Sequence, residues 1–246
     1  MTASRRQPAR RTVVRGLRRA AGPWAGSVVA VRTPRPQVAL TFDDGPEPGG
    51  TDRILTALAD VGASATFFVL LTRVRRHSAL FDEVVAAGHE IALHGLDHRA
   101  LPELPPAEAR AALRAGRAEL EDRTGAAVRW YRPPYGRQTP RTWWEVARAG
   151  MVPVLWGPTT WDWKDVPDAE RLVKAQEGVH PGAIVLGHDG FAGPDDLAFD
   201  GPPPLLDRGR LVARVLEQYS SRGLRAVSLG TALADGTAVR EARFRR

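Results

Sequence analysis

Past residue 35, the chain alternates short apolar runs with amphipathic stretches, and this alternation restricts its fold more than any other feature. Apolar runs long enough for buried strands lie at residues 38–42, 65–70, 90–93, 128–131, 152–156, 183–186 and 225–229. Stretches with the apolar spacing of helices lie at residues 51–62, 79–87, 106–125, 140–149, 168–178 and 207–222. Strands that alternate with helices indicate an α/β fold with a parallel sheet buried on both faces. About seven such units favour closure into a barrel over an open sheet.

The 246 residues suffice for a single domain of this kind, which we expect at residues 36–233, followed by a C-terminal tail at 234–246. The net charge of +7 comes from residues 1–35, which hold nine arginines and no acidic residue. The other 26 basic and 28 acidic residues leave the rest of the chain with a net charge of −2. We predict that residues 1–35 form a basic, flexible segment without a specific nucleic-acid partner, able to contact anionic surfaces. Nucleic-acid binding through this segment is the alternative, and it would weaken steeply with salt.

The sequence shows no stretch of the length and apolar character that a membrane span requires. Such a span takes about 20 apolar residues, whereas residues 25–31 are short and interrupted by Gly26 and Ser27. We therefore predict no membrane span and no export signal, which favours a cytoplasmic location; the cell surface or secretion is the alternative. Cysteine is absent, which excludes disulfides and thiolate metal sites. We expect a monomer.

Chemically active residues gather where five of the predicted strands end. They are Asp43 and Asp44, His94 with His98, Arg132, Asp162 between two tryptophans, and His188. In a parallel barrel, the carboxyl ends of the strands form one face, and working residues lie there. The sequence therefore predicts one active site built from five strand ends.

Two of these groups indicate a metal. His94 and His98 are four residues apart, so in a helical turn both imidazoles project to one side. Together with a carboxylate from Asp43-Asp44, they form a three-ligand set with an open position, which suits a divalent ion, most simply zinc. An open metal site supports amide hydrolysis, with the second carboxylate as base and His188 as acid for the leaving amine. The Asp-Asp-Gly-Pro sequence also suits a simple turn, so the aspartate pair alone decides nothing.

Five motifs that occur in order connect these residues to a known family. They are Thr-Phe-Asp-Asp-Gly-Pro at 41–46, His-x-x-x-His at 94–98, Arg-Pro-Pro-Tyr-Gly at 132–136, Asp-Trp at 162–163 and Leu-Gly-His at 186–188. Over residues 37–230 the chain closely resembles the polysaccharide deacetylases, which include chitin, chitooligosaccharide and peptidoglycan deacetylases. The resemblance implies a deformed (β/α) barrel and a metal-dependent hydrolase of carbon–nitrogen bonds other than peptide bonds. Its substrate would be the N-acetyl group of an amino-sugar glycan.

The resemblance also implies a role for each matching residue. The catalytic set would be Asp43 as general base, Arg132 as its partner, Tyr135 as backbone donor to the oxyanion, His188 as general acid and Asp162 as its orienting carboxylate. The metal ligands would be Asp44, His94 and His98, with zinc as the expected ion and cobalt, nickel or manganese as alternatives. The substrate-binding set would be Trp161, Trp163, Leu186, Pro133 and Tyr135, of which Trp163 and Leu186 would line the acetyl pocket.

The sequence departs from the family pattern at three positions, where Leu93, Gly95 and Thr159 replace an asparagine, a hydroxyl residue and an aspartate. Two alternatives remain open. One is hydrolysis of a non-sugar amide on the same fold. The other is a glycan-binding module without activity, which predicts a missing base or acid, although Asp43 and His188 are both present. The Gly- and Pro-rich stretch 191–204 is the expected determinant of substrate specificity.

Overall fold

A computed structural model describes residue 18 and residues 22–245 of the chain, so most of the basic N-terminal segment lies outside the described residues. Seven parallel strands form its main sheet in the order β6-β5-β4-β3-β2-β7, with β8 also paired to β2. The strands are β2 Gln37–Asp43, β3 Thr66–Leu70, β4 Glu90–Gly95, β5 Trp130–Tyr131, β6 Val152–Pro153, β7 Ile184–His188 and β8 Arg225–Val227. All seven coincide with predicted strands, and the α/β fold class with about seven parallel strands is confirmed.

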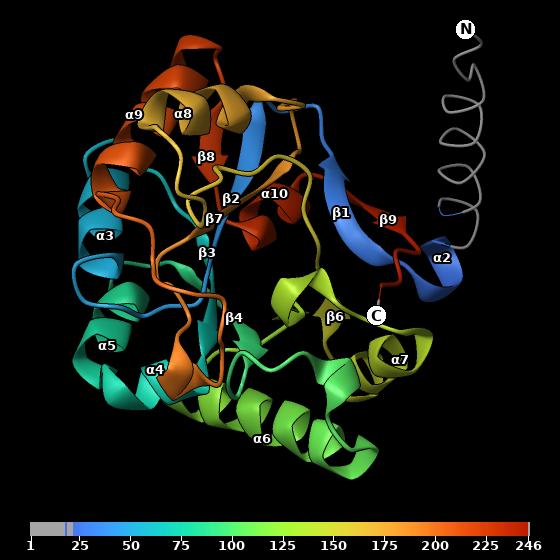
Figure 1. The fold of residues 1–246 in the computed structure, drawn as a ribbon. Helices are drawn as coiled ribbons and strands as arrows, with labels where there is room; N and C mark the ends of the chain where they lie inside the picture. The colour runs from blue at the N-terminus through green and yellow to red at the C-terminus, as the bar shows by residue number, and fades with distance from the viewer. Residues whose placement is uncertain (1–17, 19–21, 246) are drawn as a thin grey trace, which may run out of the picture.

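Helices cover the outside of this sheet, as Figure 1 shows for α3, α5, α6 and α9. The principal helices are α3 Thr51–Ala59, α4 Leu71–Arg76, α5 Ser78–Ala86, α6 Pro106–Thr124, α7 Pro140–Arg148, α8 Asp168–Gln176, α9 Arg208–Ser221 and α10 Leu229–Ala234. Six were expected from the sequence, whereas the six-residue α4 and α10 are too short to show a clear periodicity. None of the helices in the described ranges has both the length and the apolar character that a membrane crossing needs.

The core has two parts, one on each side of the sheet. On β2, Val38, Leu40 and Phe42 belong to the outer cluster beneath the helices, while Ala39 belongs to the inner cluster. Side chains alternate along a strand, so Asp43 shares the inner face with Ala39. Full burial of a Val, Leu or Phe side chain stabilises the fold by about 1.5–3 kcal/mol, so this register is strongly preferred. This register therefore places the carboxylate of Asp43 on the inner face of the sheet.

The ends of the sheet are joined by a segment that the sequence did not place in the domain. β1 Ser27–Arg32 lies between β6 and β7: Val28 bridges Val154 in parallel, and Ala30 bridges Ala183 in antiparallel fashion. β1 also pairs along its length with β9 Thr237–Glu241. The expected domain bounds of 36 and 233 therefore leave out two strands of the fold. Within residues 22–245 the parallel ladder does not close on itself, and the barrel is deformed at this seam.

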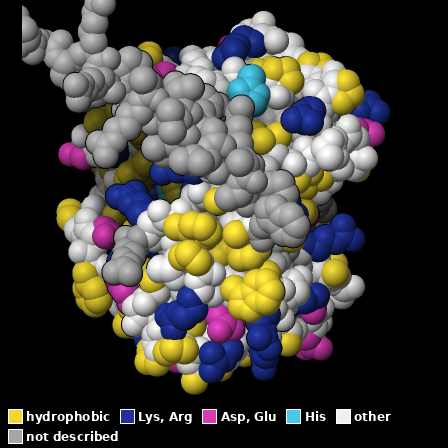
Figure 2. Space-filling model, turned by 90° about the vertical axis from the view of Figure 1, so that its right-hand side faces the viewer, with side chains coloured by type: hydrophobic (Ala, Val, Ile, Leu, Met, Phe, Trp, Pro, Cys, Tyr) yellow, Lys and Arg dark blue, Asp and Glu magenta, His cyan; other side chains and the backbone are white. Residues whose placement is uncertain are grey.

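The face that carries β1, β9 and α7 is shown in Figure 2. Arginine and acidic side chains are interspersed there with apolar ones. Trp144 of α7 is 56% exposed. Nucleic-acid binding through residues 1–35 stays an untested alternative, because most of that segment lies outside the described residues.

Candidate active site

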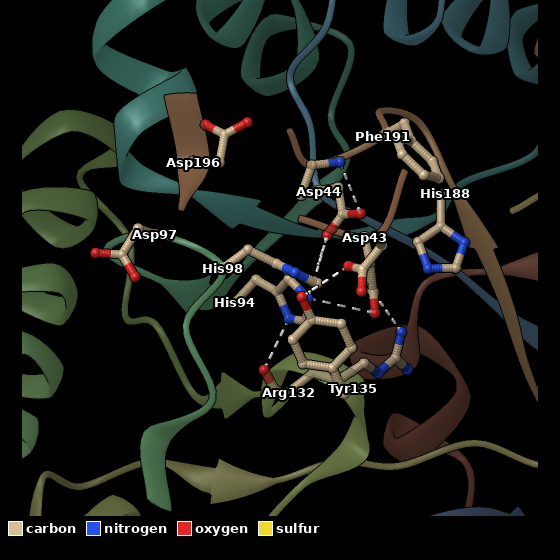
Figure 3. Close-up of polar contacts among 12 residues, drawn as sticks. Asp43, Asp44, His94, Asp97, His98, Arg132, Tyr135, His188, Phe191 and Asp196 are labelled. Carbon is tan, nitrogen blue, oxygen red and sulfur yellow. Dashed lines mark hydrogen bonds and ion pairs between the residues drawn. The ribbon is translucent and has the colours of Figure 1, made fainter. Parts of the chain in front are cut away.

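The polar residues expected at the strand ends lie together in the structure (Figure 3). Asp43 ends β2, His94 lies in β4 and His188 ends β7. Arg132 directly follows β5, and His98 lies in the loop after β4. Because all these strands are parallel, their carboxyl ends deliver the side chains to one face.

The turn after β2 explains the Asp-Asp-Gly sequence. Asp44 has a φ of 76°, a left-handed conformation that aspartate tolerates better than most residues. Gly45 cannot carry a side chain, because a Cβ there would lie 1.8 Å from Oδ2 of Asp189. Asp189 accepts the N–H of Gly45 at 3.0 Å and the hydroxyl of Thr51 at 2.6 Å. The pair of aspartates is thus both a turn and part of the site.

Asp44, His94 and His98 form a buried cluster whose potential ligand atoms all lie within 4.8 Å of one another. Nε2 of His94 and Nε2 of His98 each lie 3.3 Å from Oδ1 of Asp44. Nδ1 of His94 lies 2.8 Å from the carbonyl oxygen of Arg132, so it must carry the proton and leave Nε2 facing the carboxylate. Oδ1 of Asp44 is buried and has no hydrogen-bond partner in the described residues. An imidazole lone pair that faces a carboxylate oxygen needs a proton or a cation between them, and the cluster therefore fits a metal ion.

Two pKa shifts agree with this interpretation. Burial alone would raise the pKa of Asp44, but the adjacent His98 and His94 hold it well below its usual range. Burial also lowers the pKa of His98, and the attraction of Asp44 offsets this only in part. Anionic carboxylate and neutral imidazole are the forms that bind metals.

Arg132 holds Asp43 beside the cluster. The Arg132 side chain is fully buried, and its Nη1 donates to Oδ1 of Asp43 at 2.6 Å and to the hydroxyl of Thr41 at 2.8 Å. Its guanidinium lies over the ring of Phe68 at 4.0 Å. Oδ2 of Asp43 remains 3.9 Å from Nε2 of His94, so this carboxylate lies next to the cluster without joining it.

His188 and Asp162 form a second charged pair. Nδ1 of His188 lies 2.7 Å from Oδ1 of Asp162, and the backbone N–H of His188 donates to Oδ2 at 2.5 Å. Burial alone would lower the pKa of His188, but the Asp162 carboxylate raises it to about 9. Arg208 of α9 supports the pair: its Nη1 donates to the carbonyl of His188 at 3.2 Å and lies 3.7 Å from Oδ2 of Asp162. The imidazole is therefore a protonated group at neutral pH.

Tyr135 connects the cluster to the loop at 191–204. Its ring packs edge-on against His98 with a centroid distance of 4.4 Å, and its hydroxyl donates to Asp200 at 2.7 Å. Its φ of 58° places the backbone in the left-handed region within the short helical turn Pro134–Gly136. Pro133, just before that turn, is buried.

The two expected tryptophans have different surroundings. Trp163 packs edge-on against His188, with ring centroids 5.2 Å apart. Trp161 instead lies under the ammonium groups of Lys164 and Lys174, at 3.7 and 4.7 Å from its ring centroid. Leu186 is buried in β7, two residues before His188. Contact with the acetyl group stays a prediction for Trp163 and Leu186, and contact with the glycan stays one for Trp161.

The departures from the family pattern have local explanations. A Cβ at Gly95 would lie 2.5 Å from the carbonyl oxygen of Asp97, so the turn between the two histidines has no room for a hydroxyl residue. The carbonyl of Leu93 accepts the N–H of Arg132 at 3.0 Å, a bond that needs no particular side chain. The hydroxyl of Thr159 accepts the N–H of Trp161 at 3.1 Å and supports its strained backbone.

The sequence analysis assigned no role to five polar residues around the site: Thr41, Arg73, Asp189, Asp196 and Arg208. Thr41 begins the first motif and Asp189 directly follows the last one, which was a usable signal. Arg73, Asp196 and Arg208 are buried charges in a short helix, a loop and a helix start, and nothing local distinguishes them from exposed charges.

Comparison with known proteins bears on this arrangement. A sequence model described as polysaccharide deacetylase matches residues 30–154. The chain belongs to the polysaccharide deacetylase family. This confirms the resemblance and the predicted class of enzyme, a deacetylase that hydrolyses carbon–nitrogen bonds other than peptide bonds.

Curated relatives within the family have related names. A chitooligosaccharide deacetylase of Bradyrhizobium sp. is 40% identical over 156 residues, which are 63% of this chain and 71% of the relative. One of Sinorhizobium fredii is 38% identical over 168 residues, covering 68% of this chain and 77% of the relative. A peptidoglycan-N-acetylglucosamine deacetylase of Listeria monocytogenes is 33% identical over 62% of this chain, which is 32% of that longer protein.

Solved structures show the same fold. The Bc1960 peptidoglycan N-acetylglucosamine deacetylase superposes with a TM-score of 0.73 at 25% identity, covering 86% of this chain and 93% of that one. A structure described as T48 deacetylase with substrate superposes with a TM-score of 0.69 at 27% identity, covering 86% of this chain and 97% of that one. The polysaccharide deacetylase fold thus extends over nearly all of the described residues.

Proposed function

We propose that this deacetylase removes the acetyl group from N-acetylated amino sugars of a chitooligosaccharide- or peptidoglycan-type glycan. One observation supports this above all others: a metal-type cluster lies next to a carboxylate held by Arg132, and an imidazole held by Asp162 lies at the same sheet face. Base, metal site and acid are the three parts that metal-assisted amide hydrolysis uses. The names of the relatives indicate the glycan class, and a peptidoglycan-type substrate would favour action at the cell surface or outside the cell.

Asp44, His94 and His98 would hold the metal through Oδ1 and the two Nε2 atoms. Nitrogen and oxygen donors in a three-ligand set suit zinc, with cobalt, nickel and manganese as alternatives. A metal bound there supplies a Lewis acid that polarises the acetyl carbonyl and lowers the pKa of water. We also propose that the protein acts as a monomer.

Asp43 acts as the general base that takes a proton from the attacking water. Arg132 orients this carboxylate through the 2.6 Å hydrogen bond to Oδ1, which leaves Oδ2 directed toward the cluster. The backbone N–H of Tyr135 donates to the oxyanion that develops on the acetyl oxygen. Water adds to the acetyl carbon, and the negative charge moves to that oxygen.

His188 acts as the general acid. Its pKa of about 9 keeps Nε2 protonated at neutral pH, while Asp162 fixes the ring through Nδ1. His188 gives its proton to the sugar nitrogen as the carbon–nitrogen bond breaks, and acetate and a free amine are released. Trp163, Leu186, Pro133 and Trp161 would form the walls around the acetyl group and sugar.

The test is acetate release from N-acetylated chitooligosaccharides and from peptidoglycan fragments, compared with a panel of small non-sugar amides. We expect release from one of the glycans, its loss after chelation, and its return when zinc is added. Hydrolysis confined to small amides would favour the non-sugar alternative. Glycan binding without acetate release at any metal concentration would favour an inactive binding module.

A further inference from the structure

A buried ion pair anchors the first half of the loop at 191–204 to helix α4. Arg73 of α4 is 5% exposed and Asp196 of the loop is 0% exposed. Nε of Arg73 donates to Oδ2 of Asp196 at 2.8 Å, and the hydroxyl of Thr72 donates to Oδ1 at 2.9 Å. A buried pair of this kind is costly to break from one side, because the remaining charge has no water to solvate it.

The same arginine reaches the start of the loop. Its Nη2 donates to the carbonyl of Phe191 at 2.6 Å, and its Nη1 lies 3.2 Å from Oε2 of Glu47 as an ion pair. Glu47 in turn accepts the N–H of Phe191 at 2.8 Å. Arg73 thus joins three segments that are distant in sequence: the turn after β2, helix α4 and the loop.

This anchored part of the loop touches two of the three proposed metal ligands through its backbone. The carbonyl of Asp196 accepts the N–H of His98 at 2.8 Å. The N–H of Ala192 donates to Oδ2 of Asp44 at 3.4 Å. Figure 3 shows Asp196 and Phe191 on opposite sides of the cluster. Leu70, Ala192 and Ala198 form a small buried cluster that packs the loop down.

The site does not use Arg73 or Asp196 for chemistry, since neither side chain is among the base, acid or ligand atoms. Their contacts instead determine where the Asp196 carbonyl and the Ala192 amide lie. Groups that hydrogen-bond to metal ligands orient those ligands, and their loss costs about 10- to 100-fold in metal affinity.

We infer that Arg73 and Asp196 are positioning residues of the metal site, which hold His98 and Asp44 at the separation that a metal requires. The inference rests on the proposed function only in taking Asp44, His94 and His98 as a metal site. It makes the first half of the loop a fixed part of the site, whereas Phe199 in the second half is 78% exposed.

The experiment measures zinc affinity of the full chain by competition with a chromophoric chelator. We expect Asp196→Asn and Arg73→Met each to weaken zinc binding by about tenfold or more. Arg75→Met is the matched control, because Arg75 lies on the same helix and pairs with Glu119 at the surface, with 53% of its side chain exposed. The control should bind zinc within about twofold of the unchanged protein.

The zinc dependence of activity provides a second measurement. A purely structural role of the two residues would not change how much zinc the enzyme needs for activity. At limiting zinc the two variants should lose activity, and saturating zinc should restore most of it. Zinc affinity within about twofold of the unchanged protein in folded Asp196→Asn would overturn the inference. Should Arg73→Met fail to fold, Asp196→Asn decides alone, since it keeps the shape of the side chain and the bond from Thr72.

The outcomes separate this inference from the proposed function. If the unchanged protein binds zinc and the variants bind it weakly, yet no glycan is deacetylated, the proposed function fails and the positioning role stands. If glycans are deacetylated and the variants bind zinc as well as the unchanged protein does, the positioning role fails alone.

Discussion

The two charged pairs of the site differ in how they respond to pH. Arg132 and Asp43 have side chains that are 0% and 4% exposed, and the cation of the pair is an arginine. Burial lowers the pKa of Arg132, but an arginine remains charged at any pH at which the protein works. The cation of the other pair is His188, with 15% of its side chain exposed and a pKa of about 9. In the proposed mechanism, a permanent cation orients the base, whereas a titratable one supplies the proton.

The largest loss of activity should come from a change in the Arg132–Asp43 pair. Asp43→Asn keeps the size of the side chain and removes its ability to take a proton. We expect kcat to fall by about a thousandfold, within the range of a lost general base, with zinc binding intact. Acetate release and metal content of the purified variant check this. Turnover close to that of the unchanged protein would remove Asp43 as the base.

An intermediate loss of activity should appear in the pH dependence that the His188–Asp162 pair controls. The raised pKa means that His188 is protonated below about 9, so kcat/KM should fall as pH rises through that value. Asp162→Asn removes the charge that raises this pKa and should move the fall toward the ordinary histidine value of about 6.5. At pH 8 the loss should be roughly thirtyfold, and near pH 5 it should be small. A profile that still falls at the original pH would show that Asp162 does not control the acid.

The smallest effect should come from Arg208, which contacts the acid pair without touching substrate. Arg208→Met removes the hydrogen bond to the His188 carbonyl, worth about 0.5–1.5 kcal/mol, and should lower kcat/KM by about two- to tenfold. The neighbouring Arg210 is exposed, so Arg210→Met is the control and should change nothing. Equal losses in both variants would indicate a general effect on α9 instead of a specific one on the acid pair.

Much of the site could be predicted because it lies at strand ends. Asp43, His94, Arg132 and His188 each follow an apolar run, and a parallel sheet brings such ends to one face whatever the loops do. Trp161 shows the limit of this reasoning. It lies in the loop after β6, which ends at Pro153, and its ring lies against Lys164 and Lys174. Position at a strand end predicts proximity to the site, but not the direction of a side chain in a loop.

By itself, the sequence determined the α/β class, the seven parallel strands and the face on which the chemistry gathers, because these depend on local periods that repeat along the chain. Tertiary structure alone decided the seam and the anchoring of the loop. β1 pairs with β9 from the far end of the chain, and Arg73 meets Asp196 across 123 residues. Such contacts form only after the sheet has brought distant segments together, and no local pattern of charge or hydrophobicity encodes which segments will meet.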